Sequence, residues 1–126
     1  MTNEVMTAIY NMVKAIYEGN ETLKDGKIKI HNFYKVAENS FATYYGAFRC
    51  MLDGKCHSRG INVELRDYML NKILNDYGLD RYKTAVNAYL LFIDYDTEHK
   101  HINKIKEREL YKKHKLIIAN LESQRN

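Results

Sequence analysis

Basic side chains recur at helical spacing in the last quarter of this chain. Four of them share one side of a helix predicted for residues 97–121: Lys100, Lys104, Arg108 and Lys115. Side chains four or seven positions apart lie on the same helix face, so these cations would form a row. Such a row matches the phosphates of a nucleic acid or the carboxylates of a protein surface. The simplest alternative is a solvated helix face, because Glu107 and Glu109 interrupt the run.

A second basic segment, residues 53–60, reads Asp-Gly-Lys-Cys-His-Ser-Arg-Gly. Its two glycines, Lys55 and Arg59 could cradle an anion with backbone amides and cationic side chains. The segment lacks the Gly-x4-Gly-Lys-Ser/Thr order of a phosphate-binding loop, and no strand is predicted before it. We therefore expect Lys55 and Arg59 to belong to a docking surface, with a plain basic loop as the alternative.

Cys50, Cys56 and His57 are the residues whose types could bind zinc or act as nucleophile and base. Closed zinc sites pair two close cysteines with a second ligand pair, and that spacing is absent here. Adjacent side chains such as Cys56 and His57 rarely face each other, and no third group orients them. We expect no metal, no cofactor and no catalytic residue. His99, His101 and His114 are interpreted as surface histidines.

The eleven tyrosines supply large amphipathic side chains in a chain without tryptophan. Four are predicted to lie in or beside the core: Tyr44, Tyr45, Tyr82 and Tyr89. Four others fall off or at the edge of the apolar stripes: Tyr10, Tyr34, Tyr95 and Tyr111. Exposed tyrosine is common at protein interfaces. The complete predicted partner-binding set is Lys55, Arg59, Lys100, Lys104, Arg108, Tyr111, Lys112 and Lys115.

The elements that must position these residues are all predicted to be helices, because proline is absent and apolar residues recur near every 3.6 positions. Thr2 is the predicted N-cap of a helix over 3–18. Asn62 caps a helix that ends at Tyr77, before Gly78. The other predicted helices are 32–52, one that Asp80 caps, and 97–121. The apolar residues of the last helix are predicted to lie roughly on one side: Ile102, Ile105, Leu110, Ile117, Ile118 and Leu121. Residues 19–31, which contain Asp25-Gly26, are predicted to be a loop.

Length and composition favour one folded domain over residues 1–126. Hydrophobic residues make up 45% and charged residues 29%, as in ordinary folded proteins. We predict a compact all-α bundle of about five helices. The helix capped by Asp80 would be central, and the long basic C-terminal helix would project in part, with its middle section in solvent or bent.

The chain start resembles no secretion signal, and no apolar run is long enough for a membrane span, so a cytoplasmic location is expected.

Charge is unevenly distributed along the chain. The net charges of residues 1–26, 27–60, 61–98 and 99–126 are −2, +4, −3 and +5.

Lys, Asn, Ile and Tyr, which have A/T-rich codons, make up 48 of the 126 residues. This composition is typical of A/T-rich bacteria, their phages and their mobile genetic elements.

These observations favour a small non-enzymatic regulatory or inhibitory protein, of the transcription-modulating or counter-defence type, that docks on an acidic protein surface. The alternative is a DNA- or RNA-binding transcriptional regulator that uses the basic C-terminal helix. A helix-turn-helix around Gly78 is one way to build that alternative, with a plain helical hairpin as its competitor. A homodimer formed through the last helix is compatible with both hypotheses.

Overall fold

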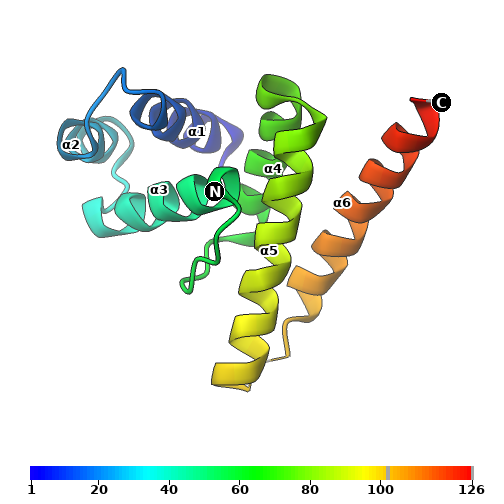
Figure 1. The fold of residues 1–126 in the computed structure, drawn as a ribbon. Helices are drawn as coiled ribbons and strands as arrows, with labels where there is room; N and C mark the ends of the chain where they lie inside the picture. Colours follow the sequence, from blue (N-terminus) through cyan, green and yellow to red (C-terminus); the bar gives the residue numbers. More distant parts are fainter. Residues whose placement is uncertain (102, 126) are drawn as a thin grey trace. The chain divides into compact units, whose positions relative to one another are not determined.

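The computed structural model describes residues 1–101 and 103–125, and this part of the chain forms six α-helices and no strand (Figure 1). The all-α prediction is therefore confirmed. Contacts group the chain into two compact units, an N-terminal unit, Met1–Arg49, and a C-terminal unit, Cys50–Asn126. The grouping of all residues into one domain stays a prediction.

The N-terminal unit begins with α1 (Asn3–Tyr17), as predicted. The Thr2 hydroxyl caps this helix by accepting a hydrogen bond from the backbone N–H of Val5 at 3.2 Å. One apolar stripe of α1 is buried: Met6, Ile9, Tyr10, Val13 and Ile16. Tyr10 is completely buried, so its predicted place at the edge of the stripe is wrong.

The predicted loop over residues 19–31 is wrong, because α2 (Leu23–Tyr34) occupies most of it. Thr22 caps α2 by accepting a hydrogen bond from the Asp25 N–H at 3.2 Å. A Cβ atom at Gly26 would lie 2.9 Å from Cδ1 of Ile16 on α1. Gly26, taken as a turn signal, instead lets two helices approach closely.

The third helix, α3 (Glu38–Asp53), begins later than predicted. Lys35 has φ 59°, a left-handed conformation that ends α2 and separates it from α3. Phe48 on α3 meets Tyr10 edge-on, with ring centroids 5.6 Å apart. The last turn of α3 belongs to the C-terminal unit and stops at Gly54, whose φ is +73°.

The C-terminal unit continues with α4 (Val63–Tyr77), and its predicted boundaries hold. The Asn62 side chain accepts a hydrogen bond from the Leu65 N–H at 3.1 Å. Gly78, with φ +90°, alone separates α4 from α5 (Leu79–Lys100). The predicted Asp80 cap is wrong, because Asp80 already lies in the first turn of α5.

The predicted helix over 97–121 is wrong as one element. Its first residues continue α5, and the left-handed His101, with φ 54°, ends that helix. The chain then returns along α5 as the antiparallel α6 (Ile105–Gln124; Figure 1). Ile102, assigned to the apolar side of the predicted helix, lies outside the described residues.

Within the C-terminal unit α5 packs against both α4 and α6, as expected of the central helix. The middle of α6 does not project, because Leu110, His114 and Ile118 are buried there. Its basic side chains remain on the other sides of the helix. In the described part of the chain, no helix is both long enough and apolar enough to cross a membrane.

Candidate functional site

All eight predicted partner-binding residues lie in the C-terminal unit, but the structure divides them into two groups. Some cations are exposed and have no ion-pair partner in the described residues. Others hold the unit together through internal contacts. Lys55 and Arg59 belong to the first group, because both are exposed on the loop between α3 and α4. This loop reaches the end of α5 through a 3.4 Å contact between Lys100 Nζ and the Ser58 carbonyl.

Lys100 and Lys104 belong to the second group because they flank a buried carboxylate. Asp96 is only 2% exposed, and its oxygens lie 3.2 Å from Lys100 Nζ and 2.9 Å from Lys104 Nζ. Lys104 also lies 5.4 Å from the ring centroid of Phe92. Burial acts to raise the Asp96 pKa, but hydrogen bonds from Lys104 and Lys100 hold that pKa below its ordinary value. These lysines therefore neutralise Asp96 across the α5–α6 connection.

Arg108 makes similar contacts between α5 and α6. Its Nη2 donates a hydrogen bond to the Thr97 hydroxyl at 2.8 Å and lies 4.0 Å from a carboxylate oxygen of Asp94. The guanidinium is therefore partly occupied within the unit. Together, the contacts of Lys100, Lys104 and Arg108 leave only part of the predicted row open to a partner.

Lys112 and Lys115 are exposed and form no ion pair within the described residues. Lys115 and the half-buried Tyr111 line a groove between α5 and α6, which we call the α5–α6 groove. This groove has a volume of about 240 Å³. Lys83 and Glu122 also line it and form an ion pair at 2.8 Å. The predicted site thus contains four open cations: Lys55, Arg59, Lys112 and Lys115.

The outward side of α6 also carries two large apolar side chains that the sequence did not single out as contact residues. Ile105 is 59% exposed and Leu116 is 66% exposed. Because they lie eleven residues apart, they fall close to one line along the helix, with Lys112 between them. Ile105 was predicted to share one side of the helix with Leu110 and Ile118. That prediction is wrong, because Leu110 and Ile118 are buried and Ile105 is exposed. The outer surface of α6 therefore combines cations with apolar contact area.

Comparison with protein-family models, curated proteins and solved structures gives no match for this chain. The function must therefore be argued from the chemistry of these residues and of the network that supports them.

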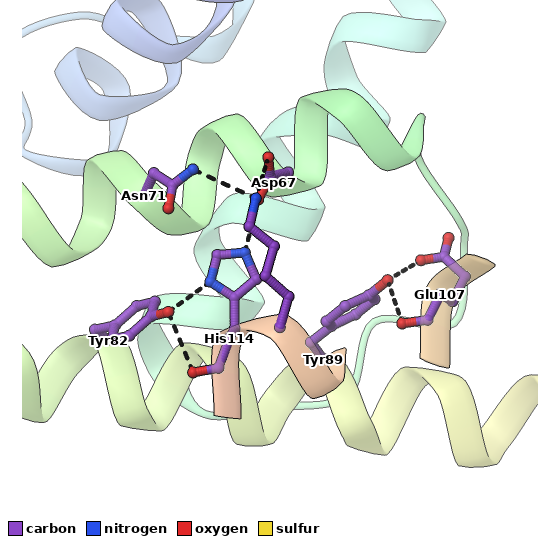
Figure 2. A network of polar contacts seen from close by, with 7 residues as sticks. Asp67, Asn71, Tyr82, Tyr89, Glu107 and His114 are labelled. Carbon is purple, nitrogen blue, oxygen red and sulfur yellow. Dashed lines mark hydrogen bonds and ion pairs between the residues drawn. The ribbon is translucent and has the colours of Figure 1, made fainter. Parts of the chain in front are cut away.

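A buried polar network fixes the opposite side of α6 (Figure 2). His114 is completely buried, so its interpretation as a surface histidine is wrong. Its Nδ1 lies 2.5 Å from the Tyr82 hydroxyl, and its Nε2 lies 2.8 Å from a carboxylate oxygen of Asp67. Lys113 Nζ contacts both oxygens of Asp67, at 3.1 and 3.2 Å. One imidazole therefore connects α4, α5 and α6.

Burial lowers the pKa of His114 below its ordinary value of 6.5, although Asp67 opposes this shift. Burial also raises the pKa of the Tyr82 hydroxyl. Asp67, His114 and Tyr82 are residue types that also occur together in catalytic proton relays. However, Tyr82 and His114 are completely buried, so a substrate could not reach them in this conformation. The network instead positions α6 on the other two helices.

A second group of buried polar residues lies beside the His114 network. The single hydroxyl hydrogen of Tyr89 is shared between the carboxylate of Glu107 and, with the oxygens 3.2 Å apart, the carbonyl of the same residue (Figure 2). The guanidinium carbon of Arg66 lies 4.7 Å from the Tyr89 ring centroid and 5.1 Å from that of Phe92. Arg66 is 1% exposed, and its Nε and Nη2 have no hydrogen-bond partner in the described residues. Burial lowers the pKa of Arg66, while Tyr89 and Glu107 favour its charged form.

The residues considered for zinc chemistry have ordinary surroundings. Cys50 is half-buried and Cys56 is exposed, and both are free thiols. Partial desolvation of the Cys56 thiol, followed by the nearby charges of Cys50 and Asp96, raises its pKa and disfavours the nucleophilic thiolate. Across residues 1–101 and 103–125, no three His, Cys, Asp or Glu side chains are grouped so that they could hold a metal ion.

Proposed function

We propose that this chain is a small non-enzymatic docking protein that regulates or inhibits an acidic partner protein. The observation that carries the proposal is the outer surface of α6. There, the open cation Lys112 lies on the same helix face as the exposed side chains of Ile105 and Leu116. Apolar area supplies most of the binding free energy of a protein interface, and peripheral charges steer the encounter.

Two features favour a protein over a nucleic acid as the partner. A phosphate backbone is recognised mainly by cations and polar groups, so the exposed Leu116 and Ile105 would contribute little to that recognition. In addition, Lys104 and Arg108 are engaged by acidic and polar groups of α5, which interrupts the row of cations. The open basic residues therefore do not form a continuous row, and they share the surface with exposed apolar side chains.

The proposed role, modulating transcription or countering a host defence system, is supported by the A/T-rich coding composition. The chain has 126 residues and a net charge of +4, so an acidic target would attract it electrostatically. Encoding by a phage or mobile genetic element of an A/T-rich bacterium is part of this proposal.

A tagged full-length chain, used as bait in a lysate of the organism that encodes it, tests the class of partner. The proposal predicts that an acidic protein co-purifies at moderate salt and remains bound after DNase and RNase treatment. The bound protein is then identified and its affinity for the purified chain is measured.

The nucleic-acid alternative predicts the opposite result. Captured material would disappear after nuclease treatment, and the purified chain would shift random duplex DNA or RNA in a gel. Affinity for nucleic acid should also fall by ~10³ or more between about 50 and 200 mM salt if roughly six phosphates are contacted. A shift at micromolar protein with this salt dependence would overturn the protein-docking proposal.

A further inference from the structure

The α5–α6 groove has the chemistry of a carboxylate-binding cleft. Two lysines, Lys83 and Lys115, line its edges, and the buried apolar residues Val86 and Ile118 contribute to its lining. Tyr111 adds an aromatic face and a hydroxyl group. Cations above an apolar lining suit a peptide segment that presents carboxylates beside apolar side chains.

Glu122 already occupies this cationic position with its own carboxylate. Lys83 Nζ lies 2.8 Å from Oε1 of Glu122, and both side chains are 45% exposed. The hydrogen bond and charge of Lys83, followed by the charges of Arg125 and Lys115, hold the Glu122 pKa below its ordinary value. Three cations therefore favour a negative charge at one point.

The internal ion pair is easily replaced. An ion pair between two half-exposed side chains contributes little to stability, because water screens the charges and both side chains lose rotamer freedom. Exchanging the Glu122 carboxylate for another carboxylate therefore costs little, and the incoming segment can also contact the half-buried ring of Tyr111. The groove also continues past Glu122 into a second hollow of about 620 Å³, which Ser123 and Arg125 line. The extended cleft has room for several residues.

We infer that the α5–α6 groove binds an acidic segment of the partner protein, whose carboxylate replaces that of Glu122 beside Lys83. This inference rests on the proposed docking function and identifies where the partner is recognised. Glu122 then acts as an internal competitor that weak or neutral segments cannot displace. The occupant is an acidic peptide, because the residues facing the cleft carry three positive charges against one negative charge.

The test uses a fluorescein-labelled peptide that alternates glutamate with leucine and measures its anisotropy with the purified full chain. Glu122→Gln removes the competing charge and should tighten binding about three-fold or more. Lys83→Gln combined with Lys115→Gln should weaken binding about ten-fold or more, because two charge-assisted contacts are lost. The matched control is Lys24→Gln with Lys106→Gln, which removes two exposed cations outside the groove. Circular dichroism checks that each variant keeps its helicity.

Two results would overturn the inference. One is an affinity in the Lys83/Lys115 variant equal to that of the Lys24/Lys106 control, which would indicate attraction by net charge alone. The other is unchanged or weaker binding by Glu122→Gln.

Amide chemical shifts provide a second measurement, since the peptide should perturb Val86, Tyr111 and Ile118. If an acidic protein is captured equally by the groove variant and the wild type, the groove fails but the docking function stands. Capture of nucleic acid alone contradicts the docking function.

Discussion

His114 of α6 lies with its Nε2 2.8 Å from Oδ1 of Asp67 on α4. The other ring nitrogen faces the Tyr82 hydroxyl of α5, so a single buried imidazole joins three helices. The outer side of α6, which carries the proposed contact residues, is positioned by this inner connection. Stability of the C-terminal unit and presentation of the docking surface therefore depend on the same helix.

Replacing His114 with alanine should lower the free energy of unfolding by about 2–4 kcal/mol. The change leaves a cavity, and it leaves the Tyr82 hydroxyl and the Asp67 carboxylate without their imidazole partner. Urea unfolding followed by circular dichroism measures the loss. The control is His99→Ala, an exposed position on α5, where we expect a change within about 0.5 kcal/mol. Equal effects at the two positions would contradict the structural role of His114.

Stability should fall as the pH drops below about 6.5. Burial lowers the pKa of His114 in the folded protein, so the unfolded chain, with an ordinary value near 6.5, takes up the proton first. The contribution is complete above about pH 6.5, is lost progressively below it, and levels off below the folded-state pKa. Unfolding measured from pH 7.5 to 5 should show this dependence in the wild type. His114→Asn should weaken it, and an unchanged profile would argue against a neutral buried imidazole.

Helices with clear boundary signals could be predicted from the sequence. Asn62 before an apolar stripe and Gly78 after it gave the limits of α4, because the local cap and the left-handed residue determine them. By contrast, α2 was missed because its local signals are polar and Asp25-Gly26 resembles a turn. Its helix is stabilised by packing of Gly26 and Ile30 rather than by a strong stripe of its own.

The candidate site was only partly predictable for a related reason. Sequence spacing placed Lys104 and Arg108 on a row of cations, but Asp96 and Thr97, which bind them, come from a neighbouring helix. Likewise His114 looked like one more polar residue of a basic segment. Its burial depends on partners 32 and 47 residues away, which no local pattern reveals.

Arg66 and Glu107 should be energetically coupled. The charge of Glu107 favours the charged form of the buried Arg66, so Glu107→Gln removes this support and Arg66→Met removes the cation. Each single change should cost about 1–3 kcal/mol, and the double variant should differ from the sum by about 0.5–3 kcal/mol. A double-mutant cycle in urea measures the coupling. Strict additivity would show that the two charges act independently.

Gly78 should not tolerate a side chain. Its φ of +90° with ψ 175° lies in a region that L-residues other than glycine rarely adopt. Gly78→Ala should therefore lower the free energy of unfolding by about 1–3 kcal/mol, although nothing lies within 4 Å of the added Cβ. Thermal unfolding gives the measurement. A loss below about 0.5 kcal/mol would mean that the α4–α5 connection adapts without strain.

Charge reversal on the outer side of α6 tests the central claim most directly. Lys112→Glu with Lys115→Glu changes two exposed cations without removing the internal contacts of Lys104 or Arg108. The variant Lys24→Glu with Lys35→Glu has the same net charge and alters exposed positions of the N-terminal unit. Affinity for the nuclease-resistant acidic partner should fall at least ten-fold for the first variant and much less for the second. Equal affinity of the first variant and the wild type would contradict docking through α6.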